Sequence, residues 1–198
     1  MFKIFTKCFR CFSKCLRKKQ SNVYTQDDYI GAGVLFTNGK NIIAGYQPNK
    51  KKPFISGIGG MRNKGETNYF ETAIRETLEE LYEIYSFPAN LLQDIKEQMI
   101  PKKVIQTERY INIVFTFTDL QILMNLTKKY SIVSELYDVL PSNINEFIFN
   151  RKILSKRTEI SHVCILPLIH NDANPQCIDP YFLSDLPQVM EISIDILQ

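Results

Sequence analysis

The sequence predicts a mixed α/β fold in which a mixed β-sheet lies between helices. Short apolar runs bounded by turn residues predict strands, and segments with apolar residues at helical spacing predict helices. The two kinds of segment intermix along the chain without an internal repeat, which favours a mixed sheet covered by helices. The 198 residues, of which 44% are hydrophobic and 23% charged, suit one globular domain.

The globular part is expected to open with a β-hairpin. Residues 33–37 and 41–46 are apolar runs separated by Asn38-Gly39, a dipeptide that favours a tight hairpin turn. Residues 48–53 contain three consecutive lysines between two prolines and predict an exposed loop. Residues 54–58 then predict a short strand that leads into a pair of glycines.

Helices and further strands are expected to follow the glycine pair. The first helix is predicted to begin at Asn68, because asparagine is a favoured N-cap and Glu71 follows three residues later. In residues 110–118 alternate positions are apolar, which predicts a strand with one buried face. Further elements are expected as helices at residues 89–99, 120–130, 143–149 and 186–197, and as a strand at residues 163–168.

Residues 1–20 differ from the rest of the chain. They hold seven lysines and arginines and no acid, and the basic residues recur at spacings of four and three beside an aromatic face. That face also carries Cys8, Cys11 and Cys15, so the segment is typical of an interfacial membrane helix whose cysteines are candidates for S-acylation. The alternatives are a disordered basic extension or a cysteine metal site. Residues 21–29 are expected to be a linker and residues 30–198 the globular domain.

The net charge of +3 belongs to this N-terminal segment. Without residues 1–20 the chain has 17 basic and 21 acidic residues, a net charge of −4, whereas a nucleic-acid-binding domain usually carries excess positive charge. Five cysteines without a secretory signal argue against a disulfide framework, and no apolar run is long enough to span a membrane. The protein is therefore expected in the cytoplasm, or at a membrane surface through an acylated N-terminal helix.

Three glutamates mark the candidate site. Glu76, Glu79 and Glu80 share one face of the predicted helix, where like charges repel each other. A divalent cation such as Mg²⁺ binds carboxylate oxygens and completes its shell with water and phosphate oxygens. Once bound, it polarises a phosphoryl group and acidifies water. An acidic helix face alone is common, but Gly60 and Glu66 upstream of it favour a metal site.

The segment from Gly60 to Glu83 resembles the Nudix box, G-x5-E-x7-R-E-U-x-E-E-x-G-U, in which U is a bulky apolar residue. The matching residues are Gly60, Glu66, Arg75, Glu76, Glu79 and Glu80. Three positions depart from the pattern. Eight residues instead of seven separate Glu66 from Arg75, Thr77 takes the first apolar position, and Tyr82 replaces the late glycine. The extra residue falls before the expected N-cap and leaves the carboxylates in place. Loss of the glycine removes a favoured helix stop.

The resemblance implies a Nudix-like α/β/α sandwich and a hydrolase that cleaves a diphosphate linkage in a nucleoside diphosphate derivative. It implies Mg²⁺ or Mn²⁺ as the cofactor, with Glu76, Glu79 and Glu80 as metal ligands and Glu79 or Glu80 as catalytic base. By the same resemblance Gly59 contributes its carbonyl to the metal. An ion pair between Glu66 and Arg75 fixes the loop against the helix.

Residues outside the box are weaker candidates. Family members usually recruit a further acid, for which Glu159 is best placed, just before the strand at residues 163–168, and Glu108 is the alternative. The run Lys50, Lys51 and Lys52 is a candidate for attracting an anionic substrate. Surface acids and lysine-rich loops also occur without any such role.

Two other functions remain open. The first is mRNA decapping or another reaction at an RNA 5′ end, which would need a basic face where the globular part has only short lysine patches. The second is a binding or regulatory module that keeps the Nudix fold without catalysis, suggested by the altered box and opposed by its intact carboxylates. No motif in the sequence identifies the particular diphosphate substrate.

Overall fold

The computed structural model describes residues 28–154, 158–168 and 177–196, with the side chains of 192–196 left aside. The predicted N-terminal helix, its three cysteines and nearly all of the expected linker lie outside the described residues. Tyr29, at the end of that expected linker, is 2% exposed, and its hydroxyl bonds to Thr72 Oγ1 at 2.9 Å. No helix in the described part of the chain is long and apolar enough to cross a membrane.

Seven strands form one mixed sheet, which confirms the predicted fold class. They are β1 (Gly31–Thr37), β2 (Asn41–Gln47), β3 (Phe54–Ser56), β4 (Ile58–Met61), β5 (Lys103–Thr107), β6 (Tyr110–Thr116) and β7 (His162–Pro167). The strand order is β3-β2-β1-β6-β5, with β4 paired to β1 and β7 paired to β2. β1 and β6 are parallel, and the other neighbouring strands are antiparallel.

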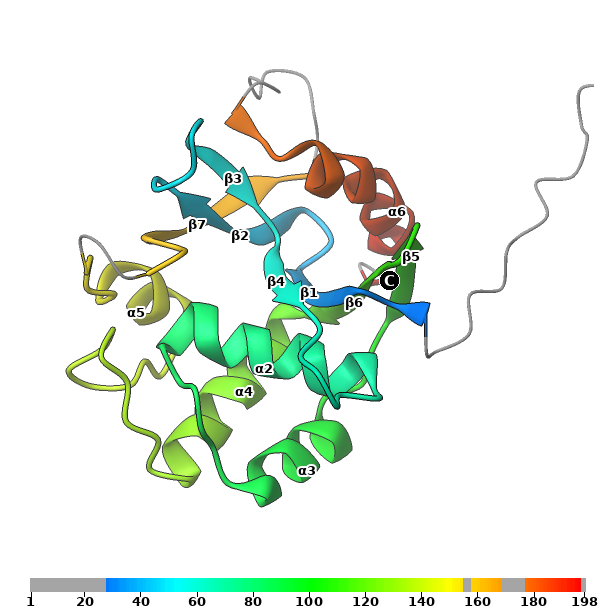
Figure 1. Cartoon of the computed structure of the whole chain (residues 1–198). Helices are drawn as coiled ribbons and strands as arrows, with labels where there is room; N and C mark the ends of the chain where they lie inside the picture. The colour runs from blue at the N-terminus through cyan, green and yellow to red at the C-terminus, as the bar shows by residue number, and fades with distance from the viewer. Residues whose placement is uncertain (1–27, 155–157, 169–176, 197–198) are drawn as a thin grey trace, which may run out of the picture.

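Helices cover both faces of the sheet, so the molecule is an α/β sandwich (Figure 1). They are α2 (Tyr69–Tyr82), α3 (Ala89–Gln98), α4 (Phe117–Lys129), α5 (Ile144–Phe149) and α6 (Pro180–Ile196). One core lies between the sheet and α2, α3 and α4, and contains Ile111, Ile113 and Phe115 of β6. Val114 of β6 faces the opposite way, into a smaller core with α6. Successive side chains of β6 thus point alternately into the two cores.

β1 changes partner along one of its edges. Its last residue, Thr37, pairs with Ile42 of β2, whereas its first half pairs with β4 and places Gly33 opposite Gly59. Gly59 has a φ of +148°, and a Cβ there would lie 2.3 Å from the Cα of Gly33. Glycine is therefore required where these strands approach, and the opening between β2 and β4 directs β4 toward α2.

Several boundaries differ from the sequence-based expectations. The strand predicted at residues 54–58 is two strands, β3 and β4, and β4 runs through the glycine pair. β5 was not predicted, because it lies at the sheet edge and Ile105 is its one buried residue. β6 ends at Thr116, which forms a capping box with Asp119 and begins α4. α6 starts at Pro180, six residues early, because Asp179 accepts the first amide hydrogens.

Candidate functional site

Helix α2 carries the candidate site on the face turned away from the core. It begins after Asn68, whose side chain accepts the N–H of Phe70 at 2.8 Å, which confirms the predicted N-cap. Apolar side chains such as Ile74 and Leu78 are fully buried against the sheet. The helix ends at Tyr82, and Glu83 takes the left-handed conformation with a φ of +57°. The left-handed stop therefore lies one residue after the missing glycine.

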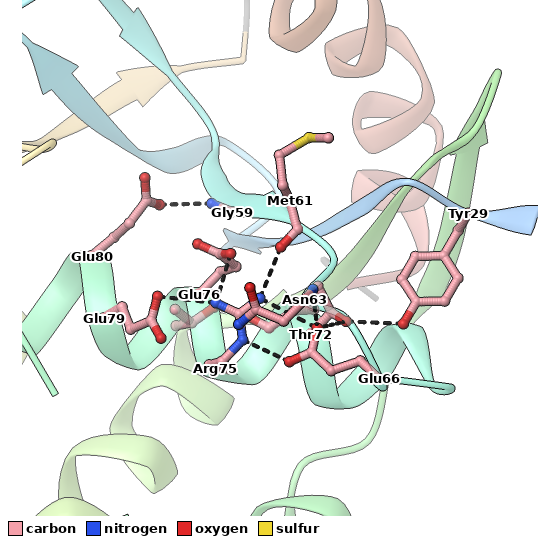
Figure 2. A network of polar contacts seen from close by, with 12 residues as sticks. Tyr29, Gly59, Met61, Asn63, Glu66, Thr72, Arg75, Glu76, Glu79 and Glu80 are labelled. Atoms are coloured by element: carbon pink, nitrogen blue, oxygen red, sulfur yellow. Dashed lines mark hydrogen bonds and ion pairs between the residues drawn. The ribbon is translucent and has the colours of Figure 1, made fainter. Parts of the chain in front are cut away.

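Glu66 and Arg75 join the loop before α2 to the helix (Figure 2). Arg75 Nε donates to Glu66 Oε1 at 2.7 Å, and Arg75 Nη2 donates to the carbonyl of Met61 at 2.8 Å. The other oxygen of Glu66 accepts the N–H of Asn63 at 2.8 Å and the hydroxyl of Thr72 at 2.7 Å. The loop therefore accommodates its extra residue and still brings Glu66 to Arg75.

The three glutamates of the box are held by Arg75 and by the glycine strand. Arg75 Nη1 lies 2.7 Å from Glu76 Oε1 and 3.0 Å from Glu79 Oε2. Glu80 points to β4, where the N–H of Gly59 donates to its Oε2 at 2.7 Å (Figure 2). A Cβ on Gly60 would lie 2.4 Å from Glu76 Oε2, so this glycine makes room for the carboxylate.

Two of the three glutamates, Glu76 and Glu80, have raised pKa values. Burial raises the pKa of Glu80 well above its ordinary value, against the hydrogen bond from Gly59, and repulsion by Glu159 and Glu76 adds to the rise. Burial also raises the pKa of Glu76, against Arg75 and together with Glu79 and Glu159. Carboxylates that are buried and repel each other in this way are stabilised by a nearby cation.

The residues fit a hard divalent cation by type and charge. In the described ranges no three His, Cys, Asp or Glu side chains converge on one point as a metal cage would require. Glu76 and Glu79 are turned to Arg75, and Glu80 to Gly59. Mg²⁺ rarely uses a full protein cage, because it keeps several waters and takes one or two carboxylates together with substrate phosphates. A complete protein cage is therefore not required for Mg²⁺ at this site.

Glu159 acts on Glu76 and Glu80 through its charge, from a distant part of the chain. Buried Arg151 donates to the carbonyls of Glu80 and Ile160, at 2.7 and 2.9 Å, and so ties the end of α2 to the segment that carries Glu159. Glu159 Oε1 also lies 2.7 Å from Lys50 Nζ, with both side chains about half exposed. Arg151 was not predicted, since nothing in its local sequence marks a buried cation.

The remaining predicted candidates lie farther from the glutamates or on the surface. Lys51 and Lys52 are exposed in the loop before β3. Glu108 is exposed in the turn between β5 and β6, at a φ of +52°. Of the two acids considered outside the box, Glu159 adds to the raised pKa values of Glu76 and Glu80, and Glu108 lies in the lining of the same pocket as Glu159.

A pocket of about 540 Å³ lies on the α6 side of the sheet, and Gly59, which bonds to Glu80, is part of its lining. Gly59, Lys50 and Glu159 line one part of it, and Asn112 and Asp185 line another. Sequence reasoning missed these last two residues. One sequence feature could have indicated Asn112 as a candidate. It is a polar residue between apolar ones in a strand that was expected to be buried.

Comparison with known proteins gives distant similarities. No family model matches the sequence, and no curated protein matches it. Among solved structures, a bifunctional NMN adenylyltransferase/ADP ribose pyrophosphatase from Francisella tularensis, complexed with AMP and Mn ion, is 14% identical with a TM-score of 0.43. The match covers 93% of this chain and 45% of that one. A second structure of that enzyme is 16% identical with a TM-score of 0.40, over 94% and 44% of the chains. The chain spans less than half the length of either structure.

Proposed function

We propose that the protein is a Nudix-type hydrolase that uses Mg²⁺ or Mn²⁺ to cleave a diphosphate linkage in a nucleoside diphosphate derivative. One observation carries the proposal: Glu80 and Glu76 of α2 lie against Gly59 and Gly60, and the charge of Glu159, from another segment, acts on both. Burial and mutual repulsion of these acids cost stability that a bound cation would restore. A diphosphate brings the further oxygens that such a cation takes.

The proposed metal ligands are Glu76, Glu79 and Glu80, with the Gly59 carbonyl and Glu159 as further oxygen donors. When bound there, the cation supplies a polarised phosphoryl group and a water of lowered pKa. Gly60 lacks a Cβ and so admits the Glu76 carboxylate against the strand. Arg75 holds Glu76 and Glu79 in place, and Glu66 fixes Arg75 in turn.

A glutamate acts as the base in the proposed reaction. The proton of the attacking water passes to Glu79 or Glu80, at the oxygen that Arg75 or Gly59 does not hold. The water oxygen bonds to one phosphorus, the bridging P–O bond breaks, and the leaving group departs with the other phosphate. Lys50, beside Glu159 at the pocket, is placed to attract the anionic substrate.

Hydrolysis of a panel of nucleoside diphosphate derivatives with Mg²⁺ or Mn²⁺ tests the proposal. We expect E76Q, E79Q and E80Q each to lower turnover by about 100-fold or more while the variants stay folded. The matched control is E71Q, because Glu71 is an exposed glutamate of the same helix outside the cluster. E71Q should retain full activity.

Two results would reject the proposal. One is full activity in all three cluster variants. The other is wild-type protein that binds nucleotide derivatives without hydrolysing any of them, which would identify a binding module. Capped RNA is included in the panel, so that preferential hydrolysis of RNA 5′ ends would be recognised by its product.

A further inference from the structure

A buried acid lies in the pocket away from the glutamate cluster. Asp185 of α6 is 3% exposed, and its two oxygens accept hydrogen bonds from two different strands. Thr107 Oγ1 of β5 donates to Asp185 Oδ1, and Asn112 Nδ2 of β6 donates to Asp185 Oδ2, both at 2.7 Å. Asp185, Thr107 and Asn112 all line the pocket, and we call them the Asp185 cluster.

The Asp185 cluster holds a carboxylate without a cation beside it. None of the ion pairs among the described residues includes Asp185. Burial raises its pKa despite the bonds from Thr107 and Asn112, and the acid Asp179 adds to the rise. A neutral side chain could join α6 to the sheet without the cost of burying a charge. Because Asp185 also lines the pocket, a ligand there that donates hydrogen bonds would stabilise its charge.

The geometry of the sheet relates this cluster to the glutamates. Gly33 of β1 lies opposite Gly59 on one side and Asn112 on the other, so Gly59 and Asn112 are two strand spacings apart. That distance is roughly 10 Å between Cα atoms, about the scale of a nucleoside. Gly59 contacts Glu80, Asn112 contacts Asp185, and both Gly59 and Asn112 line the same pocket, with the Tyr110 side chain between them against Gly33.

The pocket walls suit a flat, aromatic ligand. Four aromatic side chains contribute to the lining: Phe54, Tyr110, Tyr181 and Phe182. Nucleobases stack on such side chains with little dependence on sequence, so stacking supplies affinity but does not select a base. Selection among bases must come from the polar groups of the pocket.

The hydrogen-bonding capacity of Asp185 identifies the base. A carboxylate only accepts, with about four lone-pair positions, and Thr107 and Asn112 occupy two of them. The open positions suit two adjacent N–H donors. Guanine presents a ring N–H beside an amino group on one edge, whereas adenine and cytosine place an acceptor nitrogen beside their amino group.

We propose that the pocket binds a guanine base and that Asp185 is the specificity-determining residue, accepting the N1–H and the 2-amino group. The guanine nucleoside is then part of the diphosphate substrate, which is the one point that rests on the proposed function. The 2-amino group gives a direct comparison, because inosine differs from guanosine only in lacking it.

Nucleoside binding by the full-length protein without divalent metal tests this proposal. Guanosine, inosine and adenosine have no phosphate, so their binding is independent of hydrolysis. Calorimetry should show guanosine binding the wild type about 10- to 100-fold more tightly than inosine, the usual effect of a hydrogen bond to a charged group. In D185N the two nucleosides should bind about equally. E191Q, which changes an exposed glutamate of α6, should keep the wild-type preference.

The possible outcomes separate the two proposals. Equal binding of guanosine and inosine by the wild type, preference for adenosine, or no nucleoside binding at millimolar concentration would each overturn the guanine proposal. So would a D185N variant that keeps the preference. The wild-type comparison decides the matter even if D185N does not fold. Selective guanosine binding without hydrolysis of any derivative would leave the pocket assigned and reject the hydrolase instead.

Discussion

At the scale of single residues, Glu66 shows how the loop before α2 is stabilised. Burial raises the pKa of Glu66, but hydrogen bonds from Arg75, Asn63 and Thr72 outweigh burial and hold that pKa below its ordinary 4.5. A carboxyl whose pKa is lower in the folded chain than in the unfolded chain stabilises the fold while it is ionised. This stabilisation is present above about pH 4.5 and is lost as the pH falls through the lowered pKa.

Replacing Glu66 by glutamine should therefore have an effect that depends on pH. At pH 7 we expect E66Q to lower the free energy of unfolding by about 1–2 kcal/mol, since the bonds to Arg75 lose their charge. The difference should shrink as the pH falls below 4.5 and through the lowered pKa of Glu66. Urea denaturation of both proteins across this range measures it. A difference that stays constant with pH would show that the charge of Glu66 contributes nothing.

At the scale of elements, the end of α2 compensates for the missing glycine. Glu83 adopts the left-handed conformation, and the N–H groups of Glu83 and Ile84 donate to the carbonyls of Glu79 and Leu78. We expect E83G to raise the free energy of unfolding by about 0.5–1 kcal/mol, because glycine adopts this conformation without strain. Chemical denaturation would detect the change, and a loss of stability would contradict this account of the helix end.

Restoring the glycine of the box should have the opposite effect. Tyr82 is fully buried, and its ring centroid lies 5.7 Å from that of Tyr137 and 5.8 Å from that of Phe147. We expect Y82G to lower the free energy of unfolding by about 3–5 kcal/mol, the usual cost of removing a large buried side chain. A variant as stable as the wild type would show that the aromatic packing around α2 is dispensable.

These elements also show what the sequence can predict. The N-cap at Asn68, the buried face of α2 and the alternation in β6 follow from local patterns, and the structure contains all three. Strand β5 lacks such a pattern because it is an edge strand with one buried residue. Contacts between distant segments have no local signal at all. The Arg151 bonds to α2 and the bond from Asn112 to Asp185, 73 residues apart, are of this kind.

At the scale of the whole molecule, the two faces of the sheet differ in what lies against them. The face that packs on α2, α3 and α4 holds the larger core, and the face toward α6 includes the Asp185 cluster and its pocket. Gly59 of the glycine strand β4 lines this pocket, and its N–H bonds to Glu80 of α2 where β4 separates from β2. The fold therefore connects the glutamates to the pocket through β4, beside the central strand β1.

The N-terminal segment leads to a prediction about where the protein is found in the cell. We expect residues 1–20 to bind membranes through their basic face and acylated cysteines, a combination of two signals. Fractionation of expressing cells should find the full-length protein with membranes. Deleting residues 1–20, or changing Cys8, Cys11 and Cys15 together to serine, should move the protein to the soluble fraction. Full-length protein that is already soluble in these cells would reject the anchor.

The central claim is that the glutamates of α2 bind a divalent cation, and calorimetric titration with Mn²⁺ tests it most directly. The wild type and E71Q should bind Mn²⁺ with the same affinity, whereas E76Q and E80Q should bind it about 10-fold or more weakly while remaining folded. Equal affinity in all four proteins, or no Mn²⁺ binding by the wild type with or without a nucleotide derivative, would contradict the claim.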